Sequence, residues 1–330
     1  MTHAAGCISG PCRKIERGKE MSRTEFFYAS ADGKTQIRAL KWQPEGEARQ
    51  ILQICHGMVE HIERYDAFAS YCAGKGILVV GNDHLGHGKS VTDENQLGYF
   101  AEKNGNACVI EDIHTLRKMT QKEYPDLPYF ILGHSMGSFL VRQYIILHGE
   151  GLAGAVIMGT GAFAPAVPKA GMAVCKIIAA QKGWYYRSEF VDNMGMGAYN
   201  KKFGEKDGKD WLSRNPENVK NNLADPLCNF RFTLNAYYNM FRGLAFISTV
   251  SNLQGMPKTL PVFFVAGDDD PVGDYGAGVK KVDAQFRQTG MQDVKLKLYP
   301  GDRHEILAED DRMTVYEDIT GWMDLHEREN

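Results

Sequence analysis

The sequence lacks an excess of charge of either sign, because 38 basic and 41 acidic residues leave a formal net charge of −3. Without a positive field to attract phosphates, we expect no nucleic-acid partner. Long hydrophobic runs are missing too. The uncharged stretch at residues 151–168 contains four glycines and two prolines, which interrupt helices in water and in lipid. It therefore predicts a short buried strand followed by a loop, not a membrane span.

Cysteines are few and scattered, with seven in 330 residues and no C-x-x-C pair. This pattern excludes a disulfide framework and a zinc ribbon, and it favours reduced thiols in a cytoplasmic protein. The N-terminal segment 1–21 lacks the apolar core of a secretory signal. We expect this segment to be either a disordered tail or the product of a misassigned start upstream of Met21.

Cofactor motifs are absent as well. No G-x-x-x-x-G-K-[ST] loop occurs and no G-x-G-x-x-G follows a predicted strand, so no nucleotide or flavin is expected. Two histidine pairs, His84 with His87 and His56 with His61, have metal-like spacing. Neither pair has a third ligand at a matching spacing, and the glycines around His87 indicate a turn. We therefore predict no metal and no cofactor.

Short apolar runs alternate with helical patterns along most of the chain. The first two runs, 24–30 and 36–42, flank Asp32-Gly33 and predict an antiparallel hairpin. Strands separated by helices indicate βαβ units, so the predicted fold class is α/β, with a mostly parallel eight-stranded sheet flanked by helices. The other strands are expected at 51–55, 77–80, 129–132, 152–158, 262–266 and 294–299, and the helices at about 63–74, 106–124, 136–149, 278–289 and 309–327.

This alternation stops in the middle of the sequence. Residues 161–255 contain helix-like stretches and many aromatics but no comparable strand, which predicts a cap (lid) inserted into a core formed by 22–160 and 256–330. The aromatics could form the cap's own core or line an apolar pocket. As candidate substrate-binding residues in the cap we select Trp184, Tyr185, Phe230 and Tyr237.

A nucleophile motif follows the predicted strand at 129–132. Gly133-His134-Ser135-Met136-Gly137 is a G-x-S-x-G sequence, and a helical pattern begins directly after it. Such a strand-to-helix turn projects the serine hydroxyl above the sheet, and its two glycines permit close backbone contacts. The helix N-terminus points its amides at the reaction site, where negative charge forms.

A serine nucleophile needs a base, and the base needs an orienting acid, each after a later strand. His304 follows the last predicted strand and has little competition as the base. The acid is ambiguous from spacing, because Asp268, Asp269 and Asp270 are consecutive. The backbone N–H groups of Met136, after the nucleophile, and of Met58, after the strand at 51–55, are the expected oxyanion donors.

Three motifs together resemble one known family. The motifs are His56-Gly57-Met58-Val59-Glu60-His61 with Arg64-Tyr65, then Asp83-His84-Leu85-Gly86-His87-Gly88-Lys89-Ser90, and then the serine motif. Together they resemble the monoacylglycerol lipase and lysophospholipase-like branch of the α/β-hydrolases, with a domain of the serine aminopeptidase S33 type. The resemblance covers roughly residues 24–328. It implies that Asp270 is the acid beside Ser135 and His304. It also implies that Asp83 has a structural role.

The resemblance implies hydrolysis of carboxylic esters through an acyl-enzyme, with monoacylglycerols or lysophospholipid-type lipids as substrates. The sequence leaves open a transient contact of the cap with a membrane surface. One alternative is an aminopeptidase acting on N-terminal proline, which would need acidic groups in the cap, and Glu189, Asp192 and Asp225 are available. Another is a non-catalytic ligand-binding protein of the same fold. The oligomeric state is left open.

Overall fold

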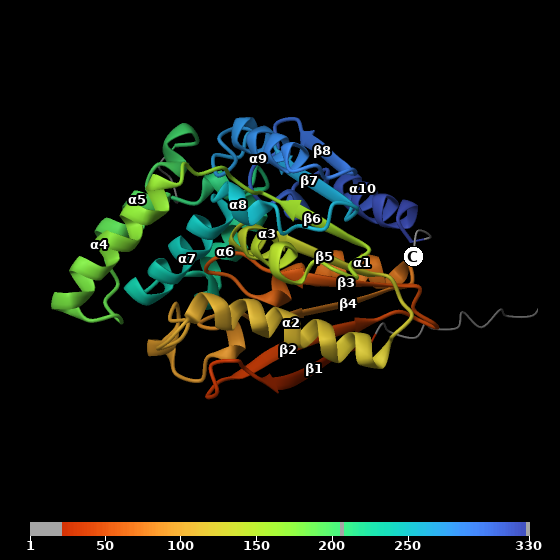
Figure 1. Ribbon diagram of the computed structural model, residues 1–330, viewed down its shortest axis with the longest axis horizontal. Coiled ribbons are helices and arrows are strands. Elements are labelled where there is room, and N and C mark those ends of the chain that lie inside the picture. The colour runs from red at the N-terminus through yellow and green to blue at the C-terminus, as the bar shows by residue number, and fades with distance from the viewer. Residues whose placement is uncertain (1–21, 205–207, 328–330) are drawn as a thin grey trace, which may run out of the picture.

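The computed structural model describes residues 22–204 and 208–327 and contains one eight-stranded sheet (Figure 1). The strand order is β1-β2-β4-β3-β5-β6-β7-β8, in which β1 pairs with β2 and β2 with β4 antiparallel, and all later pairs are parallel. The predicted α/β fold is confirmed. The strands are β1 (Ser22–Ala29), β2 (Gln36–Gln43), β3 (Gln50–Cys55), β4 (Ile77–Asn82), β5 (Tyr129–His134), β6 (Gly154–Met158), β7 (Val262–Gly267) and β8 (Val294–Tyr299).

Helices cover both faces of the sheet and bury the alternating apolar side chains of its strands. On one face pack α2 (Gly105–Glu123), α3 (Met136–His148) and α9 (Ala277–Gln288). On the other face pack α1 (Asp66–Gly74) and α10 (Arg312–Leu325). In β3, for example, Ile51 faces the first layer and Leu52 the second. A sheet buried on both faces fixes the register of its strands and the position of every loop at its carboxyl edge.

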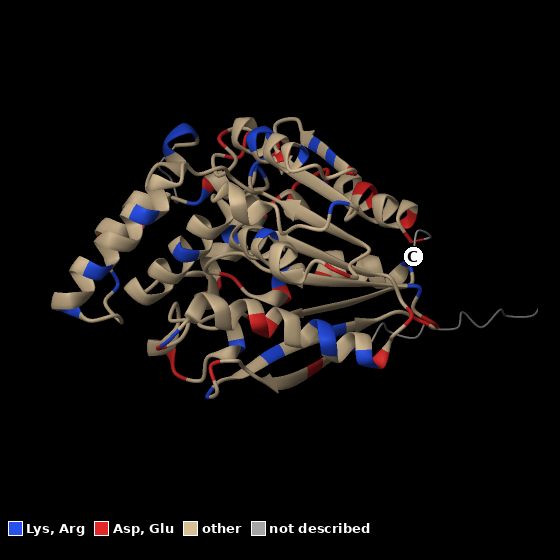
Figure 2. Cartoon of the chain, in the orientation of Figure 1, with Lys and Arg blue, Asp and Glu red and all other residues tan. Residues whose placement is uncertain are grey.

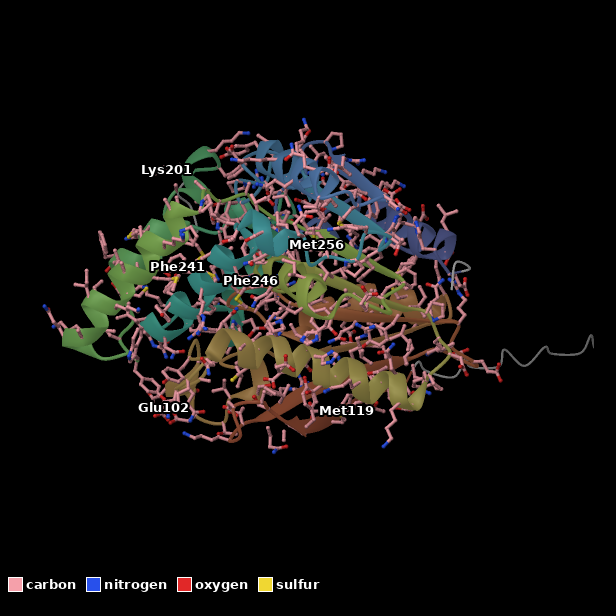
Figure 3. All side chains as sticks on the ribbon, in the orientation of Figure 1. Glu102, Met119, Lys201, Phe241, Phe246 and Met256 are labelled. Carbon is pink, nitrogen blue, oxygen red and sulfur yellow. The ribbon has the colours of Figure 1, made fainter. Side chains whose placement is uncertain are left out.

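Between β6 and β7 the chain forms helices, and no strand occurs there in the parts that the structure describes. These helices form a layer beyond the carboxyl ends of the parallel strands (Figure 1). Figure 3 labels Phe241 and Phe246, two side chains through which this insertion packs on the core, and Met256, which belongs to the same cluster. The helices are α4 (Ala166–Lys182), α5 (Glu189–Met196), α6 (Pro216–Ala224), α7 (Leu234–Ile247) and α8 (Val250–Leu253).

The domain boundaries at 160/161 and 255/256 remain predictions, and the predicted tail at 1–21 lies outside the described residues. Among the described residues, no helix is both long enough and apolar enough to span a bilayer. The five cysteines in this part of the chain are free and buried.

Candidate active site

The turn between β5 and α3 carries Ser135 in a strained conformation. Its φ of 53° and ψ of −120° lie outside the regions that L-residues usually adopt. The two glycines of the motif make this turn possible. A Cβ on Gly133 would lie 2.2 Å from the carbonyl oxygen of Gly137, and a Cβ on Gly137 would lie 2.0 Å from that of Cys55. The motif therefore packs α3 directly onto β5 and β3 and presents the serine at the carboxyl edge of the sheet.

The loops after β7 and β8 bring Asp270 and His304 together. Nδ1 of His304 lies 2.9 Å from Oδ2 of Asp270, and Oδ1 of Asp270 accepts a hydrogen bond from the Val272 amide at 2.9 Å. Both side chains are buried. Because the carboxylate accepts the Nδ1 proton, Nε2 of His304 is the nitrogen left to act as base, and it has no hydrogen-bond partner among the described residues.

The two aspartates that precede Asp270 make other contacts. Asp268 accepts a hydrogen bond from the amide of Gly301, and Asp269 forms an ion pair with Lys202. Neither contacts the imidazole of His304. The structure thus separates three residues that spacing alone left equivalent.

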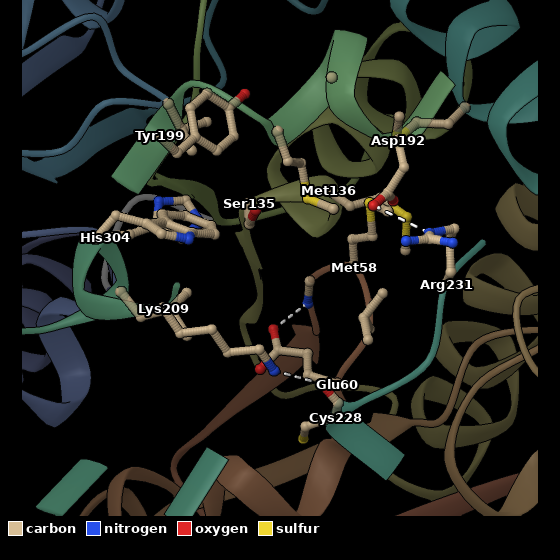
Figure 4. Close-up of a pocket in the computed structure, with 18 of the residues that line it drawn as sticks. Met58, Glu60, Ser135, Met136, Asp192, Tyr199, Lys209, Cys228, Arg231 and His304 are labelled. Carbon is tan, nitrogen blue, oxygen red and sulfur yellow. Dashed lines mark hydrogen bonds and ion pairs between the residues drawn. The ribbon is translucent and has the colours of Figure 1, made fainter. Parts of the chain in front are cut away.

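Met58 and Met136, whose backbone amides are the expected oxyanion donors, line the same cavity as Ser135 and His304 (Figure 4). Within the described chain neither amide donates a hydrogen bond, so both are available to an anionic oxygen. The loop that carries Met58 approaches the nucleophile closely, since a Cβ on Gly57 would lie 3.1 Å from Cβ of Ser135.

Buried histidines brace this loop from behind. His56 contacts the Gly57 carbonyl through Nδ1 at 2.8 Å and accepts the His84 amide through Nε2 at 3.0 Å. His87 contacts the Leu85 carbonyl and accepts the Val59 amide in the same way. Since backbone groups occupy both ring nitrogens of His56 and His87, these two side chains hold loops in place.

Asp83 is the structural residue that the resemblance implies. Its carboxylate accepts hydrogen bonds from the amides of Ile62 at 2.8 Å and Lys89 at 2.9 Å, and it pairs with the buried guanidinium of Arg38. It therefore ties the loop after β4 to the segment that follows the Met58 loop.

A buried carboxylate that the sequence analysis did not select lies beneath the site. Glu60 accepts a hydrogen bond from the Gly57 amide and another, at 2.8 Å, from the Tyr65 hydroxyl. It also lies 3.3 Å from Nδ1 of His134, whose Nε2 contacts the carbonyl of His304 at 3.1 Å. One acidic side chain thus links the loop of Met58 to the loop of His304.

Two further charges complete this network. Arg64 donates to Glu60 at 3.0 Å and to both carboxylate oxygens of Glu305, at 2.7 and 2.8 Å. Burial acts to raise the pKa of Glu60, but the hydrogen bond from His134 and the charge of Arg64 outweigh it and hold that pKa well below its ordinary value. Burial likewise acts to lower the pKa of His134, and Glu60 reverses the effect and raises it.

The cavity above Ser135 has a volume of about 550 Å³, and both apolar and polar side chains line it. Of the four predicted cap residues, Phe230 and Tyr237 line it. Trp184 and Tyr185 are not among its lining residues, since Trp184 packs against Tyr238 and Tyr185 stacks on Tyr99, and their role in substrate binding stays a prediction. The apolar lining residues that the sequence analysis did not select include Phe139, Phe163, Met196, Met240, Phe241 and Leu244.

The segment 209–215 of the insertion lies directly on the loop of His304. The rings of Trp211 and His304 are 5.0 Å apart, and the amide of Glu305 donates to the carbonyl of Leu212 at 2.7 Å. Arg214 forms ion pairs with Asp302, Glu309 and Asp311, the first two of them fully buried. The insertion therefore covers the imidazole of His304 and is anchored beside it.

Comparisons with known proteins agree with this geometry. Residues 46–311 match the family described as serine aminopeptidase, S33. A monoacylglycerol lipase of Mycolicibacterium smegmatis is 28% identical over 92% of this chain and 98% of its own length. The monoglyceride lipase of Homo sapiens is 27% identical over 86% of this chain and 84% of its own.

Solved structures show the same relationship. A thermostable carboxyl esterase from Bacillus coagulans, in complex with glycerol, has 35% identity and a TM-score of 0.86, with 92% of this chain and 98% of that chain covered. A lipase in an open form has 26% identity and a TM-score of 0.85, with 93% and 100% covered. The chain belongs to the serine aminopeptidase S33 family of α/β-hydrolases.

Proposed function

We propose that the protein is a serine hydrolase that cleaves carboxylic esters of lipids, with monoacylglycerols as the substrate class. The observation that carries the proposal is the buried contact between Asp270 and His304 at the edge of a cavity that also contains Ser135. A non-catalytic binding protein has no need for a strained serine facing such a pair.

The reaction proceeds by acyl transfer. His304 takes the proton of the Ser135 hydroxyl as its oxygen attacks the ester carbonyl, and Asp270 stabilises the imidazolium that forms. The amides of Met58 and Met136 hold the oxyanion of the tetrahedral intermediate. The imidazolium then protonates the leaving alcohol, and water, activated by the same histidine, hydrolyses the acyl-enzyme and releases the fatty acid.

The cavity wall supports an aliphatic acyl group. Phe139, Met240, Phe241 and Leu244 offer flexible and aromatic apolar surface beyond the nucleophile, as an alkyl chain requires. The relatives named as monoacylglycerol lipases and the related esterase with bound glycerol favour glycerol as the alcohol part of the substrate.

The alternative, an aminopeptidase, is disfavoured by the charges around the cavity. A free amino terminus needs an uncompensated carboxylate, but Glu60 and Glu305 are paired with Arg64, and Asp192 is paired with Arg231. Of the other two acids considered from the sequence, Asp225 is hydrogen-bonded to His61, and Glu189 is exposed and does not line the cavity.

The test compares Ser135→Ala with a control, Ser248→Ala, whose hydroxyl is remote from the cavity. We expect turnover of monoacylglycerol and p-nitrophenyl esters to fall by roughly 10⁴-fold or more in the first variant and to stay unchanged in the second. Labelling by a fluorophosphonate should disappear in Ser135→Ala only, while circular dichroism stays native. Retained turnover in that variant, or faster cleavage of proline naphthylamide than of esters by the unaltered protein, would overturn the proposal.

Two further parts of the proposal concern where the enzyme works. The insertion contacts a membrane surface through α4, which exposes Val167 and Ile177 and carries Lys169, Lys176 and Lys182 without any acidic residue (Figure 2). We expect Ile177→Glu to reduce cosedimentation with anionic vesicles and to leave hydrolysis of a water-soluble ester unchanged.

The cytoplasmic location predicted from the cysteine pattern is supported by the free, buried thiols.

A further inference from the structure

A group of three potential metal ligands lies outside the catalytic machinery, where the insertion meets the core. His61 precedes the 3-10 helix η1 (Ile62–Tyr65). Asp225 is the N-cap of the 3-10 helix η6 (Pro226–Cys228), and Cys228 is its last residue. One ligand atom from each residue lies within 4.8 Å of the other two. Imidazole nitrogen, carboxylate oxygen and thiolate sulfur are the donors that Zn²⁺ takes from proteins.

The orientation of each side chain suits a shared ion. Oδ1 of Asp225 caps η6 by accepting the Leu227 amide at 2.8 Å, which leaves Oδ2 to face Nε2 of His61 at 2.8 Å. The other imidazole nitrogen, Nδ1 of His61, is buried without a hydrogen-bond partner among the described residues and lies 3.9 Å from Glu63 Oε2. A carboxylate behind the second nitrogen is the usual outer partner of a metal-bound histidine.

Two cationic side chains lie near these ligands. Arg64 is compensated by Glu60 and Glu305, and the ammonium of Lys209 donates to the carbonyl oxygen of Cys228 at 2.8 Å, on the backbone side of that residue. Access exists from two sides, because Cys228 lines the catalytic cavity and Asp225 lines a second cavity of about 260 Å³.

We propose that His61, Asp225 and Cys228 form a binding site for Zn²⁺ or a similar divalent cation, with a fourth position open to water. On binding, the ion gains one bond each to nitrogen, oxygen and sulfur, and one proton leaves the thiol. The site connects the insertion to the loop that carries Met58 and Glu60, so its occupancy clamps the two together. This inference is independent of the proposed ester hydrolysis.

The probe is Co²⁺, added to the full chain after dialysis against a chelator. We expect one equivalent to produce a sulfur-to-cobalt charge-transfer absorption, to be displaced by Zn²⁺, and to raise the thermal unfolding temperature. Cys228→Ser should abolish the absorption. Cys175→Ser, which removes another buried cysteine of the insertion, should retain it.

A second variant keeps the test valid if Cys228→Ser does not fold. Asp225→Asn retains an oxygen for the Leu227 cap but lacks the charge, and we expect its dissociation constant for Zn²⁺ to rise at least about tenfold. Absence of the absorption in the unaltered chain overturns the site. So does an absorption that persists in Cys228→Ser, which places the ion on other cysteines, or unchanged affinity in Asp225→Asn.

Discussion

The buried carboxylate of Glu60 offers the sharpest quantitative test, through the substitution Glu60→Gln. Its oxygens accept from the Gly57 amide, the Tyr65 hydroxyl and Arg64. Glutamine has the same shape and keeps one acceptor oxygen, but its amide group places two N–H donors where the carboxylate faced Arg64. The change therefore removes charge and one set of hydrogen bonds without creating a cavity.

The expected cost in stability follows from burial. Breaking a buried ion pair by removing one partner costs about 3–5 kcal/mol, and Arg64 retains its two contacts with Glu305, so we expect about 3 kcal/mol. For a chain of 330 residues, that loss corresponds to a fall of about 4 °C in unfolding temperature. Because the Gly57 loop and the His304 carbonyl lose their common anchor, we also expect kcat to fall about tenfold with little change in KM.

The pH dependence distinguishes this mechanism from a general loss of packing. Glu60 raises the pKa of His134, so the protonated imidazole contributes stability that is fully present below its unfolded pKa and is lost as pH rises through the folded pKa. Glu60→Gln removes that contribution. The stability difference between the two proteins should therefore be larger at about pH 6 than at about pH 9.

Urea unfolding at both pH values and steady-state kinetics on a soluble ester measure these effects. The matched control is Glu123→Gln, which removes a half-exposed carboxylate paired with Lys41 and should cost no more than about 1 kcal/mol. Equal losses in the two variants, or a Glu60→Gln protein as stable and as active as the unaltered chain, would refute the reasoning.

Four other substitutions probe the fold and the cavity. Burial raises the pKa of Asp112 from 3.8 to about 7, so we expect the free energy of unfolding of the unaltered protein to fall by up to about 4 kcal/mol as the pH rises between these values. Asp112→Asn should therefore be the more stable protein above pH 7 and lose its advantage near pH 4, as measured by urea unfolding at both pH values. Gly137→Ala should cost about 3 kcal/mol or more, because its Cβ would meet the Cys55 carbonyl, whereas Gly321→Ala, with open space around it, should stabilise α10 by up to about 1 kcal/mol in the same assay. Leu244→Trp should narrow the cavity and lower kcat/KM for long-chain monoacylglycerols by at least about tenfold relative to butyrate esters; parallel losses on both substrates would contradict our assignment of the acyl wall.

The sequence was most informative where local backbone geometry dictates the residue types. The motif around Ser135 needs glycine on both sides. Its position between a strand and a helix follows from the apolar run before it and the helical pattern after it. The core elements could be placed to within a few residues, since their hydrophobic periodicity is regular. The predicted helix at 309–327, for example, is α10 at Arg312–Leu325.

The insertion was harder, because its aromatics serve several purposes. Tyr185 and Phe230 are equally apolar in sequence, yet the first stacks on Tyr99 and the second lines the cavity. The same limit applies to pairs that meet only in three dimensions, such as His61 and Asp225, which are 164 positions apart. Hydrophobic periodicity indicates which face of a helix or strand is buried. It does not indicate which residue of another layer that face contacts.

The anchoring of segment 209–215 has a practical consequence for protein engineering. Contacts to Glu305, Glu309 and Asp311 hold this stretch against the loop that carries His304, although in sequence it belongs to the insertion. Exchanging the whole insertion between relatives would disturb the alignment of the imidazole together with substrate preference. A graft limited to α4 and α5 would change only that part of the insertion. It would leave the contacts between segment 209–215 and the loop of His304 intact.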